Sequence, residues 1–269
     1  MRRCGNTIYA VALEHGYNAM NRKWFLLLVL GIVLAAAGVY LWTRTLPLKI
    51  APHPAAVDGA VETAAVTDAL HFRFDGPAGA DGVPAPWQPK VSGGKLQVEV
   101  RSREGPPDQK ALWVRSQKAS YFLADAAQPF DPAEYPYLSW SWKAVVLPTG
   151  GDVRQHNLLF GPNRNDQALQ VLVAFEGNTV LSYVWDTTAP VDTKVDEPSL
   201  AATVKTRVVD SGATYLNQWR EHKINIYNDY TRRFGKPPGC VVGVLVQTNA
   251  NHTASVGEGF FGEITASPQ

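Results

Sequence analysis

Short runs in which apolar and polar residues alternate cover most of the chain after residue 70. The clearest is YLSWSWKAV, residues 137–145, whose residues fall into an apolar and a polar set. The first set is Leu138, Trp140, Trp142 and Ala144, and the second is Ser139, Ser141 and Lys143. A strand points successive side chains to opposite faces, so the pattern predicts a half-buried β-strand with both tryptophans in the core.

Further runs of this kind are separated by Gly, Pro, Asn and Asp residues, which favour turns. They cover residues 70–74, 95–101, 111–116, 120–124, 169–175, 179–185, 203–209, 222–227, 241–248 and 259–265. About a dozen short strands with regularly spaced turns predict an all-β fold, a jelly-roll-like β-sandwich.

One segment has a helical pattern instead. YNDYTRRFG, residues 227–235, offers Asn228 as an N-cap and places Tyr230 and Phe234 on one face, four residues apart. Gly235 ends this helix, and the prolines that follow prevent it from resuming.

The longest apolar run lies near the N-terminus. WFLLLVLGIVLAAAGVYLW, residues 24–42, has no charged residue and is long enough to cross the ~30 Å hydrocarbon core as a helix. Arg22 and Lys23 precede it, and positive residues stay on the cytoplasmic side. We therefore expect a signal-anchor helix in a bacterial inner membrane. A cleaved signal peptide is the alternative, because residues 35–37 are alanines, but the run continues past them, which favours the anchor.

This topology divides the chain into a cytoplasmic tail (1–23), the transmembrane helix (24–42), an Ala/Pro-rich linker (43–69) and a periplasmic domain (70–269). Residues 1–19 do not resemble a targeting segment, whereas the stretch from Met20 does. A start codon assigned too far upstream would explain this, and so would a short cytoplasmic tail.

The topology also determines what we expect of the two cysteines. Cys4 and Cys240 fall on opposite sides of the membrane, so we expect them not to pair. Cys240 directly precedes a Val-rich strand and is expected to be a small buried apolar residue.

The charge is unevenly distributed along the chain. Residues 1–49 carry six of the 25 Lys and Arg residues and one of the 24 acids, which leaves 19 bases and 23 acids. The remainder is therefore mildly acidic, with a net charge of −4. Such a domain is not a nucleic-acid-binding protein of the usual basic kind.

Polar residues gather where the predicted strands begin or end. Asp166 lies at the mouth of the strand 169–175, and it either binds a ligand or only caps backbone amides. Trp185 and Asp186 end the strand 179–185, where an exposed Trp beside an Asp could stack on a sugar ring and bond its hydroxyls. The alternative for Trp185 is a place in the core.

A second polar loop, QTNANHT, follows the strand that begins at Val241. Asn249 and His252 in it could bond a polyhydroxylated ligand, although an Asn-rich turn has the same composition. Arg154 could pair with an acidic sugar. Because neighbouring strands bring their ends together, we expect Asp166 to lie near Asn249 or His252 at one rim of the sandwich.

Sequence motifs of catalysis are absent. The chain has no HExxH, GxSxG, P-loop or GxGxxG sequence, and its six histidines lack metal-ligand spacing. We therefore expect no cofactor, no metal site and no assigned catalytic residue.

The order of several short motifs resembles a known family. FDPAEYPYLSWSWK is followed by an acid before ALQVLVAF, then YVWD, SG and W, DYTRRFGKPPGCVVGV, QTN and a closing FFGEI. Over residues 70–266 this order resembles the bacterial domain-of-unknown-function 3047 family. The resemblance implies a secreted or envelope β-sandwich similar to galactose-binding-like jelly rolls, and no established activity. Members commonly have a second Asp where this chain has Asn165, which disfavours a two-carboxylate metal site.

Three functions remain open. The first is a non-catalytic binding module for a glycan or another envelope component, with Arg154, Asp166, Trp185, Asp186, Asn249 and His252 as contact residues. The second is a glycan hydrolase or lyase with Asp166 and His252 as acid and base. The third is a structural partner in an envelope assembly.

Overall fold

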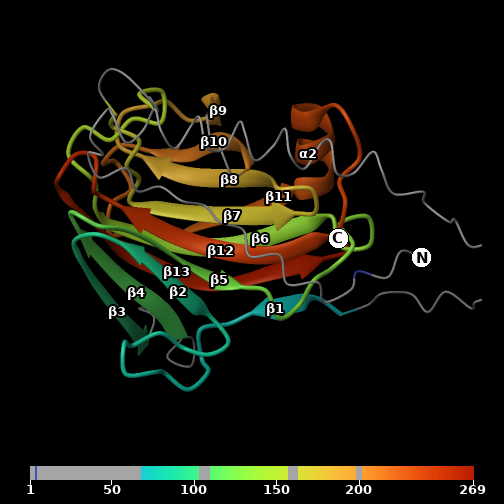
Figure 1. Ribbon diagram of the computed structural model, residues 1–269, viewed down its shortest axis with the longest axis horizontal. Helices are drawn as coiled ribbons and strands as arrows, with labels where there is room; N and C mark the ends of the chain where they lie inside the picture. Colours follow the sequence, from blue (N-terminus) through green and yellow to red (C-terminus); the bar gives the residue numbers. More distant parts are fainter. Residues whose placement is uncertain (1–3, 5–67, 103–109, 157–162, 198–201) are drawn as a thin grey trace, which may run out of the picture. The chain divides into compact units, whose positions relative to one another are not determined.

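The computed structural model describes residues 4, 68–102, 110–156, 163–197 and 202–269. In this part of the chain thirteen strands form two sheets packed face to face (Figure 1). The predicted all-β sandwich is confirmed. The predicted transmembrane helix, cytoplasmic tail and linker lie outside the described residues, and no described helix is long and apolar enough to span a membrane.

The smaller sheet has the order β11-β6-β13-β4-β3, and β1 also pairs with β13. Its strands are β1 (Leu70–Phe72), β3 (Lys95–Ser102), β4 (Lys110–Gln117), β6 (Tyr137–Val146), β11 (Arg220–Asn225) and β13 (Val256–Ser267). The larger sheet has the order β2-β5-β12-β7-β8-β10-β9. Its strands are β2 (Gln88–Ser92), β5 (Ser120–Asp125), β7 (Leu169–Phe175), β8 (Thr179–Asp186), β9 (Lys194–Glu197), β10 (Thr203–Ser211) and β12 (Val241–Asn249). All pairs are antiparallel except β8 with β10.

The facing sides of the two sheets form one core. Trp140 and Trp142 on β6 are 3% and 0% exposed, so the predicted orientation of this strand is confirmed. The indole Nε1 of Trp142 donates a 2.7 Å hydrogen bond to Oδ2 of Asp210 on β10, in the opposite sheet. Nε2 of His222 lies 2.7 Å from the same oxygen. The core therefore contains a carboxylate that links three strands from both layers.

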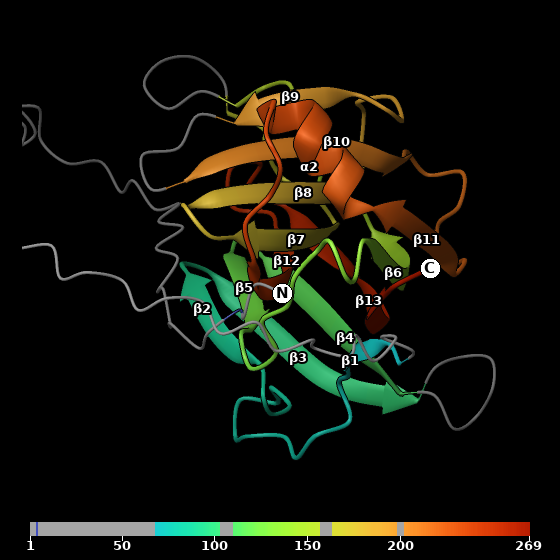
Figure 2. The same cartoon turned by 90° about the vertical axis from the view of Figure 1, so that its right-hand side faces the viewer.

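Helix α2 (Ile226–Phe234) follows β11 and lies beside β8 and β10 (Figure 2). The rings of Tyr230 and Phe234 stack with centroids 4.3 Å apart, and Gly235 ends the helix in the left-handed conformation, both as predicted. The predicted N-cap is wrong. Asn225 caps the helix by accepting from the backbone N–H of Asn228, because the helix begins earlier than its polar pattern suggested.

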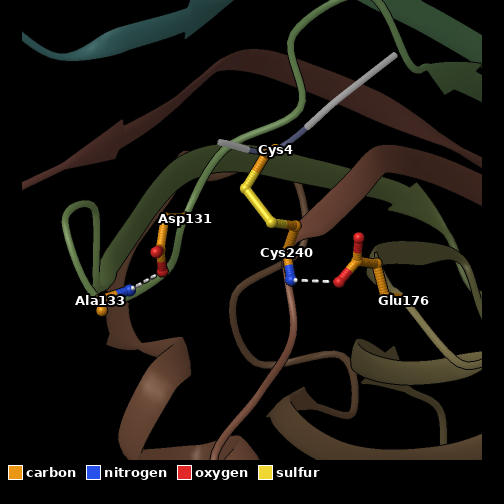
Figure 3. The surroundings of a disulfide bond; sticks show 5 residues. All are labelled: Cys4, Asp131, Ala133, Glu176 and Cys240. Atoms are coloured by element: carbon orange, nitrogen blue, oxygen red, sulfur yellow. Dashed lines mark hydrogen bonds between the residues drawn. A yellow bond between two sulfur atoms is a disulfide. The ribbon is translucent and has the colours of Figure 1, made fainter. Parts of the chain in front are cut away.

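Cys4 and Cys240 form a disulfide, with their Cα atoms 5.8 Å apart (Figure 3). The prediction that they do not pair is therefore wrong. It followed from placing the two residues on opposite sides of a membrane, whereas a disulfide requires both in one compartment. A single crossing by residues 24–42 and this disulfide exclude each other in the same molecule. Cys240 is nevertheless buried, as expected.

The register of β6 makes a stability prediction. Trp142→Ala removes a fully buried aromatic side chain and leaves Asp210 without one of its donors, so it should lower the free energy of unfolding by about 3–5 kcal/mol. Ser139→Ala, on the outward face of the same strand, should change it little. Denaturant unfolding of both variants measures the difference, and a Trp142→Ala protein as stable as the parent would contradict the register.

Candidate functional site

Four loops meet at one end of the sandwich, which we call the rim. They are the β4–β5 turn (118–119), the described parts of the β6–β7 loop (147–156 and 163–168), the β8–β9 loop (187–193) and the β12–β13 loop (250–255). Short hydrogen bonds join them: Lys118 N to Ser255 O at 2.9 Å, Thr149 N to Ser255 Oγ at 3.1 Å and Thr188 Oγ1 to Gly151 O at 3.0 Å. Residues far apart in the sequence are thereby held in one surface.

Asp166 is fully buried and binds the β12–β13 loop. Its Oδ2 accepts from Thr253 N at 2.6 Å and from Thr253 Oγ1 at 2.7 Å, and its Oδ1 accepts from His252 N at 3.3 Å. Nδ1 of His252 lies 3.4 Å from Oδ1, within ion-pair distance. The predicted proximity of Asp166 to His252 is confirmed. The geometry makes the carboxylate a clasp between two loops.

The surroundings of Asp166 keep it ionised. Burial pushes its pKa upward, but the side chains of His252 and Thr253 and the backbone N–H of Thr253 outweigh burial, so the pKa lies below its ordinary value. A carboxylate held in this way supplies no proton near neutral pH.

Asn249 forms a second clasp beside the first. Its Oδ1 accepts from Gln167 N at 2.8 Å, and its Nδ2 donates to Asn165 O at 2.8 Å. The side chain is buried, with both ends of its amide occupied. Its role in the structure is to fix the peptide on either side of Asp166.

The side chains of Asn165 and Gln167 point away from this clasp and enter a second polar network. Gln167 Nε2 donates to Asn165 Oδ1 at 2.7 Å, and Asn165 Nδ2 donates to Glu197 Oε2 at 2.9 Å. Nδ1 of His156 lies 3.4 Å from the same Glu197 oxygen, and both side chains are almost completely buried.

Burial raises the pKa of Glu197, yet hydrogen bonds from His156, Thr206 and Asn165 outweigh it and hold the pKa below its usual value. Sequence reasoning missed this buried pair. His156 and Glu197 lie on separate segments, and no spacing pattern links them.

The network extends onto the outer face of the larger sheet. Gln170 Nε2 donates to Gln167 Oε1 at 3.0 Å, but Gln170 Oε1 and Ser182 Oγ, both buried, have no hydrogen-bond partner among the residues that the structure describes. Buried polar atoms without partners are uncommon and usually bond water or a ligand.

Asp186 shapes the neighbouring loop. Its Oδ1 accepts from Thr188 N at 2.7 Å and Ala189 N at 2.6 Å, and its Oδ2 accepts from Val153 N at 2.8 Å. The side chain is fully buried, and burial raises the pKa of Asp186 despite these donors. The carboxylate thus joins the β8–β9 loop to the segment that carries Arg154.

The expectation that Trp185 stacks on a sugar from the surface is wrong. Trp185 is 0% exposed and packs in the core with Trp142, at a centroid distance of 6.3 Å. Its Nε1 donates to Gly212 O at 3.1 Å. On β8 it shares the inward face with Leu181 and Tyr183, so its position follows from the alternation of the strand.

The exposed charges of the rim are mainly positive. The Arg154 side chain is 49% exposed and pairs with Asp152 at 2.8 Å, which lowers the pKa of Asp152 to about 2. Arg164 and Lys118 are exposed, and neither forms an ion pair within the described residues. His252 is 22% exposed. The basic side chains therefore reach solvent, whereas Asp166 and Asp186 do not.

The residues described by the structure contain no group of three or more His, Cys, Asp and Glu side chains that could hold a metal ion.

Comparison with known proteins places the domain in a family. The sequence model of a family described as "Protein of unknown function (DUF3047)" matches residues 86–265. No curated protein matches the chain.

Among solved structures, an endoglucanase 3 of family GH12 from Trichoderma harzianum is 11% identical, with a TM-score of 0.38, over 77% of this chain and 99% of that one. The tandem CBM22 domains of Paenibacillus barcinonensis Xyn10C are 11% identical, with a TM-score of 0.31, over 77% and 48%. An ENZbleach xylanase mutant is 11% identical, with a TM-score of 0.34, over 80% and 93%. Structural similarity at these TM-scores does not indicate a shared function.

The clasp makes a prediction about stability and pH. Asp166→Asn turns an amide N–H₂ group toward the N–H and O–H donors of His252 and Thr253 and removes the negative charge that they stabilise. It should lower the free energy of unfolding at pH 7 by about 2 kcal/mol, the scale of hydrogen bonds to a charged group. The folded pKa of Asp166 is below its unfolded value, so this stabilisation is present above about pH 4 and is lost as the pH falls through the folded pKa.

Urea unfolding of the parent and the variant at several pH values measures this difference, which should shrink in acid. Thr253→Val, which removes only one donor, should cost less at neutral pH. A difference between parent and Asp166→Asn that does not change with pH would mean that the ionised carboxylate is not what stabilises the loops.

Proposed function

The chain belongs to the DUF3047 family, whose function is unknown, and we propose that it is a non-catalytic binding module of the bacterial envelope that recognises an acidic glycan or a comparable anionic component. We also propose that its β-sandwich is a galactose-binding-like jelly roll. The proposal concerns the rim and its exposed side chains.

One observation carries the proposal: the described rim buries Asp152, Asp166 and Asp186 and exposes its bases, while its exposed acid, Asp192, pairs with Arg207. Asp166 and Asp186 accept hydrogen bonds from backbone amides of the rim loops, while Arg154, Arg164 and Lys118 reach solvent. Guanidinium groups match carboxylates and phosphates in geometry as well as charge. Residues 70–269 carry 19 bases and 20 acids and are nearly neutral, so exposed bases gathered at the rim would select the end by which an anionic ligand approaches.

Two of the six contact residues expected from the sequence, Arg154 and His252, remain contact residues in this proposal. Arg164 and Lys118 are added to them. Asp166, Asp186 and Asn249 support the loops that carry them.

The enzymatic alternative has less support. Glycoside hydrolysis requires two carboxyl groups facing one substrate, and a general acid whose pKa is raised. Asp166 is fully buried, and its pKa is lowered. The third alternative is a structural partner in an envelope assembly. Such a partner would present a flat apolar surface, whereas the rim carries exposed charges.

A location outside the cytoplasm is part of the proposal. Disulfides persist in oxidising compartments such as the periplasm, so the pairing of Cys4 with Cys240 supports export. A single crossing by residues 24–42 would hold at the membrane only molecules in which Cys4 and Cys240 are unpaired, and fractionation of cells is the direct measurement.

The test is a binding measurement on the full-length protein in detergent. An oligogalacturonate, which carries a carboxylate on every sugar, should bind more tightly than a malto-oligosaccharide of equal length, and salt should weaken the interaction. Arg154→Gln combined with Arg164→Gln should weaken it at least ~10-fold, a loss of about 1.4 kcal/mol.

Arg73→Gln is the matched control, because Arg73 is an exposed arginine near β1, which pairs with the end of β13 remote from the rim. Melting temperatures verify that each variant is folded. Equal binding by the control and the double variant, or a preference for the uncharged sugar, would contradict the proposal.

A further inference from the structure

A fifth loop begins at the rim, between β10 and β11. Strand β10 is parallel to β8, and the register pairs Ser211 with Asp186, so the two strands end side by side. The backbone N–H of Gly212 donates to the backbone oxygen of Asp186 at 3.0 Å, and Ser211 Oγ donates to Ala189 O at 2.6 Å. The β10–β11 loop (212–219) is thereby joined to the β8–β9 loop.

The fold fixes the backbone of this loop at both of its ends. Gly212 is bonded to β8 in the larger sheet, and the backbone N–H of Asn217 donates to Ala144 O on β6, in the smaller sheet, at 2.8 Å. Between them Leu216 packs against the core, and the N–H of Gln218 donates to Tyr215 O at 3.1 Å. The part of the loop that carries Tyr215 is therefore preorganised, which lowers the entropic cost of binding.

The loop exposes an aromatic side chain beside the exposed bases of the rim. Among the residues that the structure describes, two large hydrophobic side chains are exposed, Val191 at 53% and Tyr215 at 42%. A single exposed hydrophobic residue needs no explanation. These two, however, lie on the β8–β9 and β10–β11 loops, which meet at the same end of the sandwich. The rim therefore offers apolar contact as well as positive charge.

Arg220 fixes the orientation of the tyrosine ring. Its guanidinium carbon lies over the Tyr215 ring, 4.2 Å from the centroid. Its Nε donates to Oδ1 of the buried Asp210 at 3.1 Å, so the arginine connects the ring to the carboxylate that links the two sheets. The guanidinium covers one face of the ring, yet much of the surface of Tyr215 still faces solvent.

Asp186 relates this ring to the arginines of the rim. Its side chain accepts from Val153 N at 2.8 Å, and its backbone oxygen accepts from Gly212 N. Arg154 follows Val153 directly, and Tyr215 follows Gly212 by three residues. The Cα atoms of Arg154 and Tyr215 therefore lie at most about 30 Å apart. One oligosaccharide can contact both.

An exposed aromatic ring in a fixed position suits a sugar better than other anions. The C–H groups on one side of a pyranose ring form an apolar surface that stacks on an aromatic ring, and the phenol hydroxyl can bond a sugar hydroxyl. A flexible anionic chain without rings gains no comparable contact. Tyr215 would therefore distinguish an acidic sugar from other carriers of carboxylates.

We propose that Tyr215 and Arg220 form a sugar-stacking subsite that continues the basic rim, and that the ligand of the rim is a chain of acidic pyranoses. Tyr215 stacks on one sugar ring, and Arg220 positions the tyrosine. Arg154 and Arg164 bind carboxylates of neighbouring sugars. This inference rests on the function proposed for the rim, and it names the class of ligand.

Isothermal titration calorimetry of the full-length protein in detergent tests the subsite. Tyr215→Ala should weaken the binding of an oligogalacturonate about 10-fold, because the stacking contact is lost. It should leave the binding of an oligoglutamate of equal charge unchanged, since that chain has carboxylates but no sugar ring. Tyr215→Phe, which retains the ring, should keep most of the affinity for the oligogalacturonate.

Tyr137→Ala is the matched control. Nζ of Lys223 lies 5.0 Å from the centroid of the Tyr137 ring, so this tyrosine also faces a cation. It begins β6, however, at the end of the sandwich remote from the rim. Its replacement should leave the binding of the oligogalacturonate unchanged, and melting temperatures verify that every variant is folded.

The stacking subsite and the basic rim can be contradicted separately. Normal oligogalacturonate binding by Tyr215→Ala, together with weakened binding by the Arg154→Gln and Arg164→Gln double variant, would overturn the subsite and leave the basic rim. Equal affinity of the parent for oligogalacturonate and oligoglutamate would do the same. Weakened binding by Tyr215→Ala but not by the double variant would support the subsite and contradict the role of the rim charges. Absence of binding to both probes would overturn both.

Discussion

Three consecutive polar side chains buried at the mouth of β7 constrain the arrangement of the whole rim. A buried polar group is tolerated only when it is hydrogen-bonded, and Asn165, Asp166 and Gln167 find their partners in different places. Asp166 requires the β12–β13 loop, whereas Asn165 requires Glu197 on β9. Because successive side chains of an extended segment point to opposite sides, residues 165–167 form hydrogen bonds with the β12–β13 loop on one side and with β9 on the other. The exposed arginines of the rim are held in place by this buried framework.

A similar principle operates in the core, where Asp210 accepts hydrogen bonds from Trp142 and His222. Burial raises the pKa of this carboxyl group, but His222, Trp142 and Arg220 outweigh burial and lower it. The buried Asp210 carboxylate needs several hydrogen-bond donors. Trp142 on β6 and His222 and Arg220 on β11 reach it only when these strands keep this position relative to β10. The carboxylate therefore specifies how the two sheets are aligned, in addition to any stability it contributes.

The sequence predicted what depends on local alternation. Nearly every strand was found from its period of two, and the inward orientation of Trp140 and Trp142 followed directly. The same alternation groups Trp185 with Leu181 and Tyr183, so its burial was readable, but its position beside Asp186 suggested a sugar platform instead. The edge strand β9 has four residues, too few for a period to emerge, and the partner of its Glu197 is His156, which no spacing reveals. The pairing of Cys4 was missed because a membrane topology was assumed first.

The strand order has a consequence for how the protein is made. β12 lies between β5 and β7 in one sheet, and β13 lies between β4 and β6 in the other, so the last hairpin of the chain completes the middle of both sheets. Until residues 241–267 have been synthesised, β2 and β5 have no connection to the remainder of the larger sheet. A nascent chain cannot acquire its fold gradually from the N-terminus, and contacts between distant residues must form together at the end. Completion of both sheets therefore waits for residues 241–267, whichever strands have paired before them.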